Sequence, residues 1–178
     1  MCSLLAQGGT GLNQKLAISP LMRFDAAMAS AGTAEACWLA LDRLAEEVAG
    51  HKLFTVMTLD LAHDVARRVY TNNPAVYPVS GTKPITHDRW FEIVHGERKT
   101  FVANTLAELA TVFPDHESIA SLGCGSVVNL PVVLAGNLAA TINMLHEEHH
   151  YSPARVAMIE SALAIPAKLA LLAARALA

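Results

Sequence analysis

The chain has 178 residues, of which 53% are hydrophobic, so it is long enough to bury the core of one domain. A formal net charge of -3 without a lysine or arginine cluster argues against nucleic acid or an anionic membrane as a partner. The three scattered cysteines do not form a disulfide framework and no secretory signal pattern is present, so we expect a cytoplasmic protein.

The first part of the chain predicts an arm and then a helix. Residues 1–19 carry three glycines and no sustained apolar periodicity, which predicts a flexible N-terminal arm before a single domain over residues 20–178. Thr33 can cap a helix that Gly50 would end. The apolar stripe of that helix would consist of Cys37, Leu41, Leu44 and Val48.

Two runs rich in β-forming residues, 53–61 and 65–71, predict a first hairpin. The proline, glycine and asparagine residues of the next segment, 72–84, exclude regular structure and predict an unusually long loop. Loops of more than about a dozen residues often cover binding sites in compact domains. This loop, with Tyr70 just before it and Tyr77 within it, is therefore a functional candidate.

Short elements follow the loop. Thr86 can cap a short helix that carries Trp90, Phe91 and Val94. We then expect a strand at 101–104 and helices at 105–112 and 114–122. After the two strands of a second hairpin, Ser152-Pro153 begins a C-terminal helix. That helix is very apolar, but we expect no membrane anchor because it is interrupted by Pro166, Lys168 and Arg175.

The second hairpin turns at Ala135-Gly136-Asn137, and its register decides which side chains share a face. A two-residue turn at Gly136-Asn137 would place Asn129 and Asn143 on opposite faces, each among aliphatic residues. A three-residue loop with Asn137 in the left-handed conformation makes one face wholly apolar. We prefer this second register, which pairs Leu134 with Leu138, Val132 with Ala140, Leu130 with Ile142, Val128 with Met144, Asn129 with Asn143, Pro131 with Thr141 and Val127 with Leu145.

The two faces of this hairpin predict two different neighbours. The apolar face requires helices, and the amphipathic helices at 33–48 and after Ser152-Pro153 are long enough to cover it. The face with two amides and a hydroxyl would point toward the short helices and the long loop, where a small polar molecule could bind. Alternatively, Asn129 and Asn143 satisfy each other or nearby backbone, as buried amides usually do. The sequence leaves both interpretations open.

The segment LGCGSVVNLPVVLAGNLAATINMLHEEHHYSPARVAMIESAL resembles the closing half of a GAF domain. The matching features are Ser126, Pro131, Gly136, Asn143 and the helix start Tyr151-Ser152-Pro153. The similarity extends more loosely back to about Thr33. The chain thus resembles a stand-alone GAF domain of the bacterial type, and this motif specifies a fold rather than a chemistry.

The resemblance implies an α+β fold related to PAS domains, with a central antiparallel sheet. The terminal helices would pack on one face, and short helices and a long loop would cover a ligand pocket on the other. It also implies a small-molecule sensor, since GAF domains bind cyclic nucleotides, bilins or metabolites, and a homodimer through the terminal helices. No effector domain is recognisable in the chain, and the cofactor stays unknown.

Two cysteine chemistries of this family can be weighed. Free methionine-(R)-sulfoxide reductases are GAF enzymes that need a nucleophilic and a resolving cysteine, and Cys124 is the candidate nearest to the expected pocket. The family's cysteine positions are not reproduced, so a small buried hydrophobe is the better interpretation of Cys124. Covalent bilin attachment is disfavoured as well, because Pro114, Asp115 and His116 occupy the region where the family has its cysteine.

Metal-dependent hydrolysis is a third alternative, since residues 146–150 read His-Glu-Glu-His-His and satisfy the HExxH pattern. The chemistry needs both histidines one helical turn apart. His146 would end a strand and Ser152 would begin a helix, so the motif falls in a loop. We therefore predict neither a metal site nor a catalytic residue.

The prediction is a noncovalent small-molecule-binding protein without enzymatic activity. Large aromatic residues such as these candidates are more often core residues than ligand contacts, and their placement around the long loop shifts this balance only somewhat. A redox enzyme using Cys124 and a dimerisation module with a filled pocket are the alternatives. The residues expected to line the pocket are Tyr70, Asn72, Tyr77, Trp90, Cys124, Asn129, Thr141 and Asn143.

Overall fold

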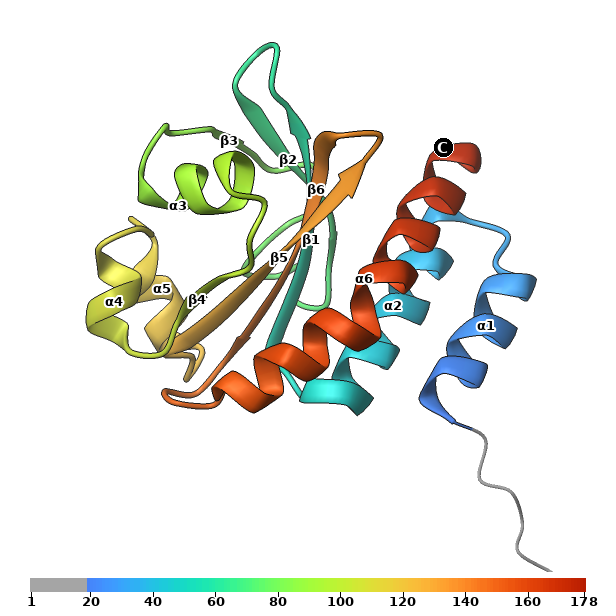
Figure 1. Cartoon of the computed structure of the whole chain (residues 1–178), viewed down its shortest axis with the longest axis horizontal. Coiled ribbons are helices and arrows are strands. Elements are labelled where there is room, and N and C mark those ends of the chain that lie inside the picture. Colours follow the sequence, from blue (N-terminus) through green and yellow to red (C-terminus); the bar gives the residue numbers. More distant parts are fainter. Residues whose placement is uncertain (1–18) are drawn as a thin grey trace, which may run out of the picture.

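A computed structural model describes residues 19–178 of the protein (Figure 1). Its centre is a six-stranded antiparallel sheet in the order β3-β2-β1-β6-β5-β4. The helices are α1 (Pro20–Ser30), α2 (Ala34–Ala49), α3 (Arg89–Phe91), the π-helical turn η1 (Glu92–Gly96), α4 (Leu106–Ala110), α5 (His116–Ser121) and α6 (Pro153–Ala176). The strands are β1 (Leu53–Asp60), β2 (Val65–Thr71), β3 (Thr82–Pro84), β4 (Phe101–Ala103), β5 (Ser126–Leu134) and β6 (Asn137–His146).

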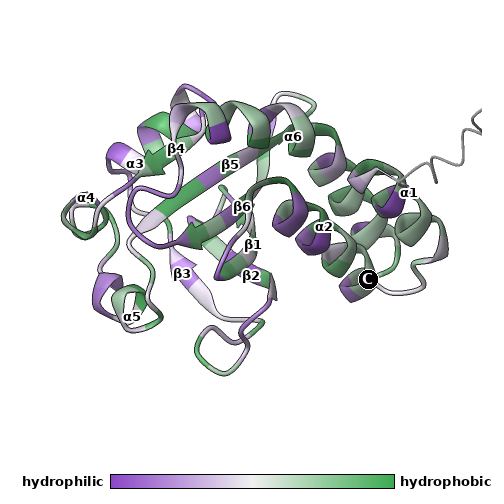
Figure 2. Cartoon of the chain, turned by 90° about the horizontal axis from the view of Figure 1, so that it is seen from below, coloured by the Kyte–Doolittle hydropathy of each residue, from purple (hydrophilic) through white to green (hydrophobic). Residues whose placement is uncertain are grey.

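Helices cover both faces of the sheet (Figure 1). On one side lie the long helices α2 and α6 with α1 outside them, and on the other side lie the short helices α3, α4 and α5 (Figures 1 and 2). Each side has its own hydrophobic cluster. The predicted α+β class, and the assignment of the long helices to the apolar face of the second hairpin, are therefore confirmed.

The predicted caps of the long helices are present. The Thr33 hydroxyl accepts a hydrogen bond from the Ala36 backbone N–H at 3.1 Å, and Gly50 ends α2 with a φ of 73°. The Ser152 hydroxyl caps α6 in the same way, followed by Pro153 in the first turn.

Helix α1 was not predicted from the sequence. The Ser19 hydroxyl accepts from the backbone N–H of Met22, and Pro20 occupies the first helical position. Only Phe24 of this helix is buried. The arm predicted for residues 1–19 lies, apart from Ser19, outside the described residues.

The register predicted for the second hairpin is confirmed over most of its length. Asn129 pairs with Asn143, Pro131 with Thr141 and Val127 with Leu145. The apolar pairs Val132 with Ala140, Leu130 with Ile142 and Val128 with Met144 also form. Their side chains pack into the cluster under α2 and α6.

The turn of that hairpin was predicted wrongly. Leu134 pairs with Asn137 and Val133 with Leu138, which leaves a two-residue loop of Ala135 and Gly136. Both loop residues have positive φ, 47° and 81°, as a type I′ turn requires. An irregularity between Val132 and Val133 restores the predicted pairing beyond the turn, so the side-chain faces are unchanged.

Two predictions about the loop region need correction. Residues 82–84, expected to be irregular, form β3 and pair with β2 at the edge of the sheet. Asp88 rather than Thr86 caps the next helix, because its side chain accepts the backbone N–H of Phe91 at 3.1 Å. The helix then widens into the π-helical turn η1, which buries Val94.

Among residues 19–178, α6 is the one helix that is long and apolar enough to cross a membrane when only length and composition are considered. Its most apolar stretch has a mean hydropathy of 1.7. Core helices can meet the same criteria. Ile159, Leu163 and Leu171 of α6 pack in the cluster against α2 and the sheet.

The positive φ of Ala135 predicts a stabilising substitution. Asn tolerates this conformation, and Asn-Gly is a favoured type I′ pair, so Ala135→Asn should raise the free energy of unfolding by about 0.5–1 kcal/mol. Ala62, an exposed turn residue without positive φ, supplies the control Ala62→Asn, which should give no gain. Urea denaturation measures both, and an equal effect of the two substitutions would contradict the predicted turn strain.

Candidate functional site

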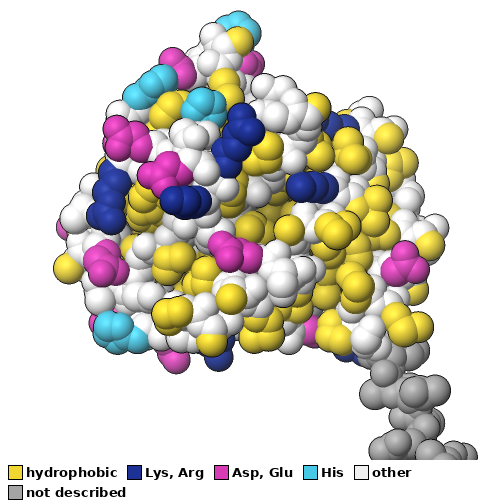
Figure 3. Space-filling view, viewed as in Figure 1, with side chains coloured by type: hydrophobic (Ala, Val, Ile, Leu, Met, Phe, Trp, Pro, Cys, Tyr) yellow, Lys and Arg dark blue, Asp and Glu magenta, His cyan; other side chains and the backbone are white. Residues whose placement is uncertain are grey.

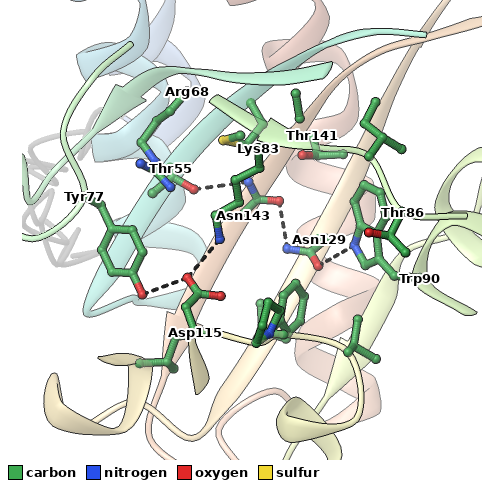
Figure 4. Close-up of a pocket in the computed structure, with 18 of the residues that line it drawn as sticks. Thr55, Arg68, Tyr77, Lys83, Thr86, Trp90, Asp115, Asn129, Thr141 and Asn143 are labelled. Carbon is green, nitrogen blue, oxygen red and sulfur yellow. Dashed lines mark hydrogen bonds and ion pairs between the residues drawn. The ribbon is translucent and has the colours of Figure 1, made fainter. Parts of the chain in front are cut away.

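A cavity of about 560 Å³ lies between the sheet and the segments that cover its second face (Figure 4). This volume is within the range of small-molecule sites. The walls are chiefly apolar, with Leu53, Met57, Leu59, Ile85, Val112, Phe113, Ile119 and Leu145 among them. The lining residues that carry a polar group are Thr55, Arg68, Tyr77, Lys83, Thr86, Asp88, Trp90, Asp115, Asn129, Thr141 and Asn143.

A chain of hydrogen bonds crosses the floor of the cavity (Figure 4). The indole Nε1–H of Trp90 donates to Asn129 Oδ1 at 2.9 Å, and Asn129 Nδ2 donates to Asn143 Oδ1 at 2.7 Å. Asn143 Nδ2 then donates to Thr55 Oγ1 at 3.1 Å. These bonds link α3 to the three neighbouring strands β5, β6 and β1 and hold both amides in fixed orientations. The alternative that Asn129 and Asn143 satisfy each other is thus correct in part, because the two amides share a hydrogen bond. Both residues nevertheless line the cavity.

Charged groups lie at one end of the cavity. The Lys83 ammonium contacts Asp115 Oδ2 at 2.9 Å, and the Tyr77 hydroxyl donates to the same oxygen at 3.3 Å. Burial acts to raise the pKa of Asp115, but the Lys83 contact outweighs it and holds that pKa below its usual value. Burial and the Asp115 carboxylate together raise the pKa of Tyr77. Asp115 is therefore an ionised acceptor shared by two donors.

The structure brings five of the eight predicted pocket residues into the wall of this cavity: Tyr77, Trp90, Asn129, Thr141 and Asn143. Four of the five are buried and Trp90 is half-buried. Contact with a ligand by these residues stays a prediction.

Two of the other three residues lie toward the α2 side. Tyr70 packs in the cluster under the long helices, and its hydroxyl donates to Asp42 Oδ2 at 2.8 Å. The Asn72 amide is used by backbone, since Oδ1 accepts from Phe54 N at 2.9 Å and Nδ2 donates to Lys52 O at 3.4 Å. Neither residue lines the cavity.

Cys124 is the third residue outside the cavity wall. Its side chain is buried in the cluster beneath the short helices, and burial raises the pKa of the thiol. A raised pKa lowers the thiolate fraction at neutral pH, which is the form that attacks electrophiles. The environment therefore resembles that of a structural cysteine.

A β-bulge explains why Tyr70 and Arg68 face opposite sides of the sheet. Val56 pairs with Tyr70 and the next residue, Met57, pairs with Arg68, so β2 has one additional residue, Val69. Regular alternation would place Tyr70 and Arg68 on the same face. Sequence reasoning missed Arg68, Lys83 and Asp115 as site residues. The β2 sequence carries Arg67 beside Arg68, so charge within the strand did not mark which of the two faces the cavity.

His146, Glu147 and His150 also come together, with one ligand atom from each within 4.8 Å of the others. They lie where β6 ends and in the loop before α6, so the helical spacing that metal-dependent hydrolysis needs is absent, as predicted. The side chains have protein partners: Lys52 pairs with Glu147, and the His150 ring contacts Ala49 O and Arg155 at 2.8 Å each. The predicted lack of a metal site stays a prediction.

No protein-family model and no curated protein matches the chain by sequence. Solved structures match its fold closely. The GAF domain of a phosphoenolpyruvate-protein phosphotransferase from Coxiella burnetii has a TM-score of 0.64 and 18% identity, over 88% of this chain and 93% of that one. The GAF domain of a two-component sensor histidine kinase from Bacillus halodurans has a TM-score of 0.62 and 12% identity, over 80% and 98%.

The chain has the GAF fold. A further GAF-fold neighbour is an enzyme, the free methionine-R-sulfoxide reductase of Neisseria meningitidis in complex with its substrate, with a TM-score of 0.62 and 15% identity over 87% of each chain. Sensor domains and a substrate-binding enzyme thus share this fold. At these sequence identities the similarity shows the fold alone. What the cavity of this chain binds has to be argued from the residues that line it.

The amide chain predicts coupled losses of stability. Asn143→Ala would leave buried groups of Asn129 and Thr55 without partners, and we expect the free energy of unfolding to fall by about 1–3 kcal/mol. Asn129→Ala should cost a similar amount. The double variant should cost less than the sum, because both changes break the same bond.

Chemical denaturation of the wild type and the three variants measures this coupling. Asn137→Ala is the control: this exposed asparagine begins β6, and its amide donates only an exposed hydrogen bond to the Ala135 carbonyl oxygen. It should change the free energy of unfolding by less than about 0.5 kcal/mol. Strict additivity of the two single changes would contradict a connected chain.

Proposed function

We propose that the protein binds a small molecule noncovalently in the cavity on the second face of its GAF-fold sheet and acts as a sensor or regulatory domain. One observation carries the proposal: the cavity has an apolar wall and a floor of fixed amides. Such a combination buries an apolar body while a few polar groups set its orientation.

The neighbours support binding at this site by analogy only. Among them are a sensor kinase domain, a chromophore-binding domain of a bacteriophytochrome from R. palustris, and a reductase bound to its substrate. They share with this chain a fold that accommodates ligands of different chemistry. The class of ligand that this chain binds therefore has to be inferred from the residues that line its own cavity.

Native mass spectrometry of the purified protein tests the proposal. We expect a small molecule to be retained by the wild type and lost from Thr141→Trp, because Thr141 lines the cavity and an indole there would occupy its volume. Thr111→Trp is the matched control, since Thr111 is exposed and outside the cavity wall, and it should retain the ligand. A ligand retained equally by Thr141→Trp would contradict binding in the cavity.

The redox alternative depends on Cys124. Because this thiol is 2% exposed and its pKa is raised by burial, we expect no methionine sulfoxide reduction by the protein. Cys37, the other described cysteine, is also buried and lies on the opposite side of the sheet. Reductase activity that disappears in Cys124→Ser would overturn the non-enzymatic proposal.

We also propose a homodimer through α6. Apolar residues follow one another along this helix at intervals of four and three: Met158, Ala162, Ile165, Leu169, Leu172 and Ala176. This set, the α6 stripe, has the spacing of a coiled-coil seam, and Ile165 is 76% exposed. Hydrophobic side chains gather on this side of the molecule (Figure 3). A second copy would cover them with its own stripe.

Substitution in the α6 stripe tests the dimer. Ile165→Glu would place a charge in the centre of the seam, so we expect it to convert a dimer into a monomer at micromolar concentration. Glu160→Lys, an exposed change on another face of α6, is the control and should remain dimeric. Sedimentation velocity measures the mass, and a wild type that is monomeric at these concentrations would contradict the proposal.

A cytoplasmic location is part of the same proposal. The two described cysteines are free, which suits a reducing compartment.

The second function that we consider is a dimerisation module without a ligand, which the α6 stripe would favour. The open cavity and its buried polar floor favour the binding function.

A further inference from the structure

We infer that the ligand of the cavity is a small organic anion whose carboxylate or phosphate group binds the guanidinium of Arg68. This inference deepens the proposed function and rests on it, because it assigns a ligand class to the same cavity. The inference is based on the buried guanidinium of Arg68, which has hydrogen-bond donors without a partner among the described residues. Arg68 belongs to β2 and lines the cavity near Thr55 and Tyr77 (Figure 4).

Arg68 is a buried cation whose guanidinium contacts no carboxylate among residues 19–178. The residue is 7% exposed, and it forms no salt bridge within the described part of the chain. Buried charges in proteins are normally paired, because removal of an ion from water is unfavourable unless another charge compensates it. The Tyr77 ring lies 4.9 Å from the guanidinium carbon, but a cation–π contact compensates only part of that cost.

The hydrogen bonds of Arg68 leave one edge of the guanidinium vacant. Nη1 donates to the Pro78 carbonyl oxygen at 3.2 Å. Nε is buried and has no hydrogen-bond partner among residues 19–178, and Nη2 makes no hydrogen bond to them either. Nε and Nη2 together form the side-on edge that binds carboxylate and phosphate groups through two parallel hydrogen bonds. A ligand anion would satisfy both donors at once.

The nearest acidic group is committed elsewhere. Asp115 pairs through Oδ2 with Lys83 and accepts from Tyr77, so its salt bridge is with Lys83. Burial holds the pKa of Arg68 below its usual value, and the charge of Asp115 offsets only part of this effect. The other carboxylate of the lining, Asp88, caps α3. Of the cationic lining residues, Arg68 is thus the one without a paired carboxylate.

Asp115 supplies a second, complementary contact. Its Oδ1 is buried and has no partner among the described residues. A hydrogen-bond donor on the same ligand would satisfy it, while the apolar wall would take the body of the molecule. The cavity therefore fits an organic anion that has an apolar part and a donor group.

Three probes of the same shape test the anion directly: benzoate, phenyl phosphate and the neutral benzamide. Any retained molecule is first removed by unfolding and refolding, and native mass spectrometry verifies that the protein is ligand-free. This protein is titrated with each probe in an isothermal titration calorimeter. We expect benzoate or phenyl phosphate to bind at least tenfold more tightly than benzamide, and the tighter of the two identifies the anionic group. Equal affinities for benzamide and both anions would overturn the inference.

Arg68 and its neighbour Arg67 offer matched variants. Arg68→Met removes the charge at similar length, and we expect it to abolish the preference for anions. Arg68→Lys keeps the charge but lacks the edge with two parallel donors, so this variant should retain only part of the preference for anions. Arg67→Met, at an exposed position on the same strand, should bind like the wild type. An anion preference that survives in Arg68→Met would overturn the assignment.

Thermal unfolding distinguishes recognition from a structural role. Without ligand, Arg68→Met should unfold at the same temperature as the wild type or higher, because an unpaired buried charge is removed. Anions should raise the unfolding temperature of the wild type and leave that of the variant unchanged. A markedly lower unfolding temperature of ligand-free Arg68→Met would instead assign Arg68 to anchoring the loop through Pro78, and would overturn the inference.

The outcomes separate the two proposals. Binding of benzamide and benzoate alike, with no effect of Arg68→Met, would refute the anion and preserve the cavity as a binding site. No binding of any probe, together with no retained molecule in the wild type, would refute both.

Discussion

The register of β5 against β6 is the constraint on which the rest of the structure depends. Because side chains alternate along a strand, pairing Asn129 with Asn143 places the aliphatic pairs of Val128, Leu130 and Val132 on the opposite face. One face can then be covered only by the apolar sides of α2 and α6. The other face keeps amides and hydroxyls, and a cavity forms where the short helices do not fill the space above them.

The buried polar groups on the second face have two different states. The amide floor is satisfied internally, from Trp90 through Asn129 and Asn143 to Thr55, so it stabilises the fold and orients the amides. Arg68 is left with a vacant donor edge. Polar groups that are satisfied within the protein preorganise a site, whereas polar groups without a partner select the ligand that satisfies them. The unpartnered donors of Arg68 are the reason that we infer an anionic ligand.

The sequence was sufficient for features that depend on local pattern. The apolar stripe from Cys37 to Val48, with Thr33 and Gly50 at its ends, predicted α2 because capping and periodicity act within a few residues. The hairpin faces were predictable for the same reason. The resemblance to GAF domains added the layer order, which the fold comparisons bear out.

Features that depend on long-range geometry could not be predicted. The extra residue Val69 in β2 reverses the side-chain faces between Tyr70 and Arg68, and nothing in the local sequence marks it. Tyr70 was expected in the pocket because it lies next to the long loop, and Arg68 was not considered. The turn was misplaced because Asn137 tolerates positive φ better than Ala135, yet the strand pairing imposes that strain on Ala135.

The central claim is that a small molecule contacts the amide floor. The most direct measurement is a two-dimensional ¹⁵N NMR spectrum of the side-chain amides and the Trp90 indole, recorded during titration with the tightest-binding small molecule. We predict that the resonances of Asn129, Asn143 and the Trp90 Nε1–H shift together, while the backbone-bound amides of Asn72 and Asn104 stay in place. Binding that leaves the three floor resonances unchanged would contradict the claim.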